Sequence, residues 1–172
     1  MIGEHGGDDA PMASRIDGHR LSEFIYGTVT GMVAIAGISG GHEESWLEAA
    51  SVIVTGAAAI WVAHAYSILI SKRVVAGHRL GAHELGETLV GSWPIVSAGV
   101  LLAIPLLPVA AGLWSLDFAL WAATLIGVLI LALVGVLAGV VTHETWPRRV
   151  MLAAFSAGLG LAVVAVEFAV HH

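Results

Sequence analysis

The chain has 172 residues, of which 58% are hydrophobic and only 12% are charged. This composition lies far from the soluble average and indicates an integral membrane protein of one domain, with the lipid bilayer as its main partner. The formal net charge is −6 and the few cations are scattered, so no basic face for nucleic acid is expected. Cysteine is absent, which excludes disulfides, thiolate metal sites and thiol catalysis.

The amino-terminal residues 1–19 are polar and lack the apolar core of a cleavable signal, so we expect a flexible cytoplasmic tail. Residues 20–172 are predicted to form a single all-α, polytopic domain of five transmembrane helices. A spanning helix needs roughly 20 mostly apolar residues. The first segment is shorter and rich in Gly and Thr, so a tilted span or a re-entrant hairpin stays open beside a full span. The five segments are 22–39, 46–70, 88–109, 118–141 and 150–170.

The third segment carries three prolines, Pro94, Pro105 and Pro108. Proline lacks the amide that a helix interior requires, so we expect this helix to be kinked or to end early. Broken helices are frequent in transporters, although prolines also occur in spans that transport nothing.

Glycines recur at four-residue spacing in two of the predicted spans, as Gly27 and Gly31 and again as Gly135 and Gly139. Such stripes let two helix backbones approach closely within lipid. Packing within one chain is the favoured interpretation, and a dimer seam is the alternative.

The cations are segregated along the chain. All seven Lys and Arg residues fall in three polar stretches that lie on one side of the membrane if five segments cross it. The connections 40–45 and 112–117 hold no cation. The positive-inside rule therefore predicts a cytoplasmic amino terminus and an external carboxyl terminus, and we expect a bacterial inner membrane. The cations are Arg15, Arg20, Lys72, Arg73, Arg79, Arg148 and Arg149.

The sequence Glu-Phe-Ile-Tyr-Gly-Thr-Val-Thr-Gly at 23–31, followed by Ala-Gly-Ile-Ser-Gly at 36–40, resembles the opening helix of the vacuolar iron transporter family. The third segment has a proline-leucine-leucine-proline end similar to that of the family's third helix. The two Gly-rich last helices also match in order and spacing. The resemblance covers about residues 20 to 170, and its further stretches are 55–58, 66–67, 72–73, 93–94, 104–108 and 147–149.

The resemblance implies a five-helix homodimer that exchanges ferrous or manganous ions for protons. This chain departs from the family in three ways. Thr30 stands where the family has an aspartate, and the second helix has His64 and no carboxylate where the family has a methionine and a glutamate. The family's long cytoplasmic helical insert is reduced here to residues 74–87. We therefore expect a divalent-metal or proton-coupled transporter, with a non-transporting scaffold or complex subunit as the alternative. No serine nucleophile motif or phosphate-binding glycine loop is present, so an enzyme is not expected.

His64 is the only ionisable residue deep in an apolar span. Such a residue usually faces the bundle interior, and a neutral imidazole can relay a proton or bind a divalent ion. A core histidine bonded to a neighbouring hydroxyl is equally open. We expect His64 to face Thr28 or Thr30. The predicted transport pathway comprises His64, Tyr66, Thr28, Thr30 and Tyr26.

A second set of His and carboxylate residues lies on the predicted cytoplasmic side. Two pairs in it have four-residue spacing, which places each pair on one helix face. Imidazoles and carboxylates suit Zn, Mn or Fe(II) as a transported ligand, although solvated juxtamembrane residues are the plainer reading. We expect His83 and Glu87 to lie near Glu23 or Glu144. The predicted metal ligands are His83, Glu84, Glu87, Glu23, His19, His143 and Glu144, with His78 nearby in the chain.

Overall fold

A computed structural model describes residues 12–39, 45–76 and 81–170 of the chain. Every regular element in these ranges is helical. His78 and Arg79, named above, lie outside the described residues. The elements in chain order are α1 Met12–Ser39, α2 Trp46–Ala76, α3 Ala82–Gly91, α4 Trp93–Ala103, the 3₁₀ turn η1 Ile104–Leu106, α5 Leu107–Ala110, α6 Leu116–Val141 and α7 Trp146–Val170.

Five stretches are long and apolar enough to cross a bilayer, which confirms the all-α fold with five spanning helices. The first span is one continuous helix rather than a re-entrant hairpin. That helix begins at Met12, so its first turns occupy part of the stretch expected to be a tail. The five stretches are Gly18–Ile38, Trp46–Val75, Ala82–Ala110, Leu116–Val141 and Trp146–Val166.

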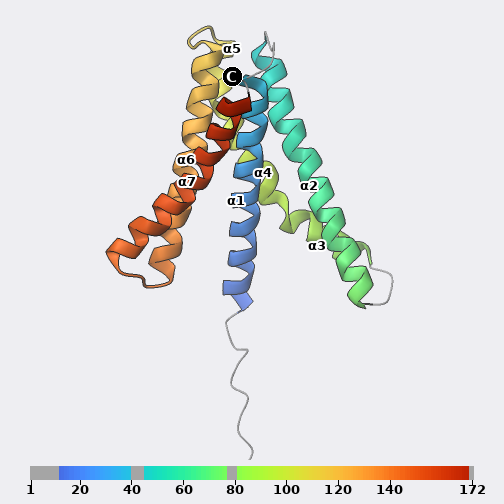
Figure 1. Ribbon diagram of the computed structural model, residues 1–172. Helices are drawn as coiled ribbons and strands as arrows, with labels where there is room; N and C mark the ends of the chain where they lie inside the picture. Colours follow the sequence, from blue (N-terminus) through green and yellow to red (C-terminus); the bar gives the residue numbers. More distant parts are fainter. Residues whose placement is uncertain (1–11, 40–44, 77–80, 171–172) are drawn as a thin grey trace, which may run out of the picture.

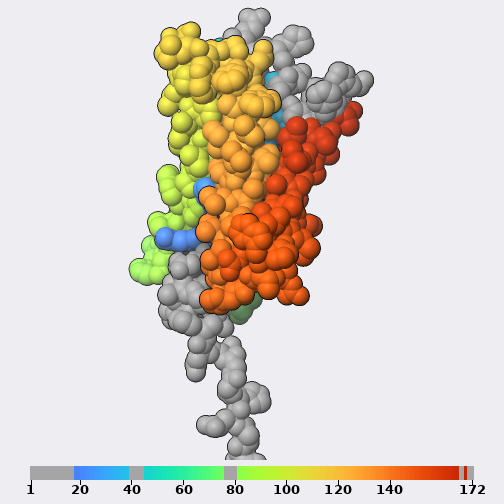
Figure 2. Space-filling view, turned by 90° about the vertical axis from the view of Figure 1, so that its left-hand side faces the viewer, coloured from blue at the N-terminus to red at the C-terminus, as the bar shows by residue number. Residues whose placement is uncertain are grey.

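The helices converge at one end of the molecule and diverge at the other (Figure 1). The start of α1, the end of α2 and the start of α7 all lie at the divergent end, so the described cations gather there. The buried core lies toward the convergent end and includes Met32 and Ile35 of α1, Ile53 of α2 and Leu102 of α4. In a side view, α4, α6 and α7 form one continuous surface (Figure 2). The side of the membrane that each end faces stays a prediction.

The third span is broken, as its prolines predict. Pro94 has no amide to donate and its ring would collide with the carbonyl one turn earlier, so α3 cannot run on into α4. Ser92 occupies the break, with φ −84° and ψ 2°, and its amide caps α3 by donating to the Thr88 carbonyl. A second change of geometry follows at Pro105, in the 3₁₀ turn η1. The two ends of the segment consequently run in different directions (Figure 1).

Both glycine stripes are used within the chain. A Cβ on Gly27 would lie 2.7 Å from the Ile95 Cα, so α1 and α4 touch through their backbones. A Cβ on Gly135 would lie 2.6 Å from the Leu152 carbonyl oxygen, which gives the same close contact between α6 and α7. The next glycine of each stripe is also in close contact. Packing within one chain therefore explains both stripes, as favoured from the sequence.

Candidate functional site

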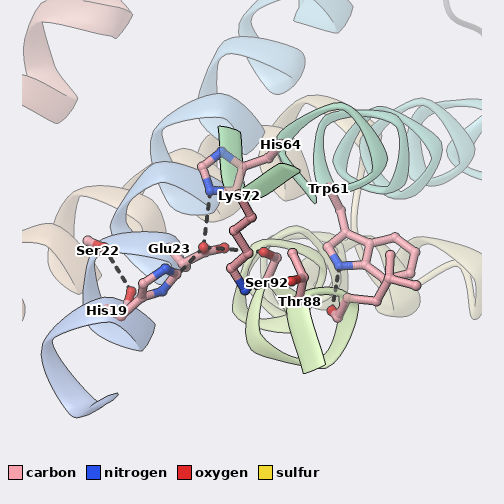
Figure 3. A network of polar contacts seen from close by, with 9 residues as sticks. His19, Ser22, Glu23, Trp61, His64, Lys72, Thr88 and Ser92 are labelled. Carbon is pink, nitrogen blue, oxygen red and sulfur yellow. Dashed lines mark hydrogen bonds and ion pairs between the residues drawn. The ribbon is translucent and has the colours of Figure 1, made fainter. Parts of the chain in front are cut away.

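The most deeply buried ionisable side chain described in the structure is Glu23 of α1, which is 2% exposed. Its Oε1 atom lies 3.0 Å from Nε2 of His64, on α2, and accepts a hydrogen bond of 3.3 Å from Oγ of Ser92, at the α3–α4 break. Nδ1 of His19, one turn earlier on α1, lies 3.3 Å from the same oxygen. We call Glu23, His64, Ser92 and His19 the Glu23 cluster (Figure 3).

The glycine stripe of α1 places Glu23 inside the bundle. Residues four apart share a helix face, so Glu23 lies on the same face as Gly27 and Gly31. Because Gly27 has no side chain, the start of α4 comes into backbone contact with α1 just beyond Glu23. That contact brings the buried hydroxyl of Ser92 to the carboxylate. The break in the third span thus places a polar side chain, Ser92, next to Glu23, where a continuous apolar helix would offer no polar partner.

The cluster is arranged to hold a proton. An imidazole nitrogen and a carboxylate oxygen at hydrogen-bond distance need a proton between them, carried by one or the other. The second carboxylate oxygen, Oε2, is buried and has no hydrogen-bond partner among the described residues. A buried carboxylate oxygen without a partner is costly, so Oε2 is a place where a proton, a water molecule or a cation stabilises the site.

A groove of about 880 Å³ lies beside the cluster, between α1, the end of α2 and α3. His19 and Ser92 belong both to the groove wall and to the Glu23 cluster, so they separate the groove from the carboxylate. We call this space the α3 groove. Its remaining lining residues are Arg20, Ile68, Lys72, His83, Gly86, Glu87, Thr88, Val90 and Gly91.

Two side chains of α2 hold α3 in place along the groove. Nζ of Lys72 donates a hydrogen bond of 2.9 Å to Oγ1 of the buried Thr88. Nε1 of Trp61 donates a hydrogen bond of 3.0 Å to the Leu89 carbonyl, and its ring meets that of Trp93 edge to face. These contacts fix the short helix against the long one, and thereby fix the position of Ser92 at its end.

The structure corrects the expected partner of His64. The imidazole contacts Glu23, whereas both threonine hydroxyls donate to backbone carbonyls within α1. Thr28 donates to the Phe24 carbonyl, and Thr30 donates to the Tyr26 carbonyl. The Tyr26 ring packs on His64, with the ring centres 5.6 Å apart. Of the predicted pathway set, Tyr66 is 65% exposed and takes no part in the cluster.

The predicted ligands on α3 form local contacts instead of a shared site. Nδ1 of His83 lies 3.4 Å from Oε1 of Glu87, and both side chains are exposed. The Glu84 carboxylate accepts a hydrogen bond of 2.8 Å from the Gly81 amide and so caps the start of α3. Capping satisfies an amide that has no partner inside the helix, which gives Glu84 a structural role.

The remaining two predicted ligands lie in the α6–α7 turn, across the divergent end from α3 (Figure 1). His143 has a φ of 54° and occupies the left-handed position that closes α6, where its amide donates to the Val140 carbonyl. The Glu144 carboxylate is bound to Arg148 at 3.0 Å. Among the described residues, no group of three or more His, Asp or Glu side chains is placed to hold a metal ion. The metal-ligand set therefore stays a prediction.

Sequence reasoning assigned Glu23 to a cytoplasmic metal set and did not single out Ser92, Thr88, Lys72 or Trp61. Two signals were available. The four-residue spacing of Glu23 from Gly27 predicts that Glu23 faces a neighbouring helix. The position of Ser92 directly before Trp93 and Pro94 predicts a polar side chain at a helix break.

We compared the chain with protein-family models, with curated proteins and with solved structures, and found no match in any of the three. The family resemblance described above is thus an expectation from the sequence alone.

Proposed function

We propose that this protein is a small membrane transporter that moves protons in exchange for a divalent metal ion, with Glu23 as its proton-binding residue. The observation that supports this is the buried Glu23 carboxylate, which His64 and Ser92 contact through one oxygen while the other oxygen has no described partner. Ionisable groups within membrane spans are costly and usually mark an ion or proton pathway.

Two imidazoles flank the same carboxylate oxygen and give it two routes for a proton. The His19 side chain is 56% exposed and lines the α3 groove, whereas the His64 side chain is 36% exposed and reaches the carboxylate from α2. An imidazole accepts a proton on one nitrogen and releases one from the other, so each ring can pass a proton to or from Glu23. When Glu23 is protonated the site is neutral, and loss of the proton leaves a buried negative charge that favours an incoming cation.

The divalent cargo, Fe²⁺ or Mn²⁺, is inferred from the resemblance to vacuolar iron transporters, and Zn²⁺ is a further candidate because imidazoles and carboxylates also suit it. The same resemblance supports a homodimer with a cytoplasmic amino terminus, and the charge pattern of the sequence also favours that orientation, which we place in a bacterial inner membrane. Because the stripes at Gly27 and Gly135 are filled by helices of the same chain, the dimer interface lies elsewhere. Transport rather than catalysis is the activity that we assign.

Flux in proteoliposomes tests this proposal. Purified protein is reconstituted with a pH-sensitive dye inside the vesicles, and an inward Mn²⁺ gradient is imposed. We expect proton efflux with the wild-type protein and none with Glu23→Gln, which keeps the hydrogen bonds but can no longer gain and lose a proton. Glu144→Gln is the matched control, because Glu144 is bound to Arg148 and lies outside the cluster. Equal flux through Glu23→Gln and the wild type would refute the role of Glu23.

A non-transporting scaffold is the second candidate, and two observations favour it. Thr30 stands where the family has its aspartate, and the described residues contain no three-residue metal site. A ligand that binds only the folded state must raise its thermal stability. A transporter is therefore stabilised by Mn²⁺ or Fe²⁺, whereas a scaffold shows neither flux nor a metal-dependent shift in Tm.

A further inference from the structure

The α3 groove combines apolar walls with two cations. Ile68 and Val90 contribute apolar surface, while Arg20 and Lys72 contribute positive charge. Among the described residues, neither of these cations forms an ion pair. Among the described lining residues Glu87 is the one carboxylate, and it is paired with His83. With neutral histidines the lining therefore carries two positive charges against one negative charge, and the groove suits an anion with an apolar part.

We propose that the α3 groove binds the headgroup phosphate of an anionic phospholipid through Arg20 and Lys72. This inference does not depend on the transport activity proposed above. The hydrogen bond from Lys72 to Thr88 holds the ammonium group at the groove wall, so its position is set before a ligand arrives. Arg20 reaches the groove from α1, and the two cations therefore approach a phosphate from different helices. A planar guanidinium is well suited to phosphate oxygens.

The location and size of the groove favour a lipid over a free phosphate ion. The groove lies at the divergent end of the bundle, where the described cations gather beside the ends of the spanning helices. Basic pockets at such a membrane interface attract anionic headgroups. A volume of about 880 Å³ far exceeds that of a phosphate ion, and the exposed Val90 beside it offers a surface for the first acyl carbons.

Lipid titration of the purified full-length protein tests this site. Tm and binding are measured in detergent micelles with added dioleoylphosphatidylglycerol, with dioleoylphosphatidylcholine, and with inorganic phosphate alone. We expect the anionic lipid to raise Tm more than the zwitterionic one, and phosphate alone to have no effect. Each of Arg20→Gln and Lys72→Gln is expected to weaken binding of the anionic lipid about fivefold, the effect of removing one interfacial cation.

Arg73→Gln is the matched control, because it removes the same charge from the neighbouring position of α2 but does not line the groove. This variant should bind the anionic lipid as the wild type does. Lys72→Gln also loses the hydrogen bond to Thr88, which can lower Tm without any lipid. The lipid effect is therefore the difference in Tm with and without lipid for the same variant. Lys72→Arg keeps the positive charge and should restore the binding of the anionic lipid. Equal losses in Arg73→Gln would show diffuse surface attraction and overturn the proposal. A stabilisation by inorganic phosphate that equals that of the lipid would overturn the lipid assignment.

Discussion

Glu23 and Glu144 lie toward the same end of the molecule, and each has a basic neighbour, yet their surroundings differ completely. Glu23 is 2% exposed and is contacted by imidazoles and a hydroxyl. Glu144 is 31% exposed and is bound to Arg148, which is itself largely exposed and permanently charged. An exposed, permanently charged guanidinium pairs with Glu144, whereas the partners of Glu23 are two imidazoles and a hydroxyl. The two carboxylates are of the same residue type, and they are distinguished by their burial and by the chemistry of the side chains that contact them.

The packing that carries Glu23 into the interior gives the largest expected effect. In Gly27→Ala the new Cβ would lie 2.7 Å from the Ile95 backbone, so α1 and α4 must separate. Overpacking of this kind costs about 1–3 kcal/mol in the free energy of unfolding. Gly37→Ala is the control on the same helix, since nothing lies within 4 Å of a Cβ there. Thermal unfolding in detergent compares the two, and similar stabilities would show that the close contact does not form.

Loss of the contact between His64 and Glu23 should have an effect of the same order. His64→Ala removes the partner of a buried carboxylate, which we expect to cost about 1–3 kcal/mol. Adding Glu23→Gln to this variant removes the buried charge and should recover part of the loss, and a double-mutant cycle measures that coupling. Strictly additive losses would mean that the two side chains do not interact.

The smallest effect is expected at the α6–α7 turn. Glu144→Gln breaks an exposed ion pair with Arg148, and such pairs contribute about 0.2–1 kcal/mol. High salt should reduce even this difference, because surface charges are screened. If Glu144→Gln lowered the free energy of unfolding as much as His64→Ala does, the two carboxylates would not differ in the way we infer.

Much of the architecture follows from local sequence. The spans are recognised as runs of apolar residues, because hydropathy depends on one continuous segment of the chain. The break in the third span follows from Pro94, because the missing amide and the bulky ring act within one helix turn. The gathering of the cations at one end follows because two crossings, an even number, separate each cationic stretch from the next along the chain. The packing role of the glycines was also predicted from their spacing.

The candidate site was predicted only in part. His64 was singled out because an ionisable residue in an apolar span is costly, and the structure places it in contact with another ionisable group. Glu23 was named, but as one of the metal ligands on the predicted cytoplasmic side. His143 and Glu144 were named as ligands, although one closes a helix and the other pairs with Arg148. The spacing of these residues along the chain identifies them as candidates. It does not show which residues of other helices they contact.

The sequence by itself determined the class of protein, the number of spans and the interruption of the third span by its prolines. Only the tertiary structure decided that His64 meets Glu23 and that Ser92 joins them, because these residues are separated by 41 and 69 positions along the chain. Hydropathy shows which segments are apolar enough to lie in lipid. Many different arrangements of the same helices satisfy that condition equally well. The choice among those arrangements depends on backbone contacts such as that of Gly27 with Ile95, and these exist only when the helices are packed together.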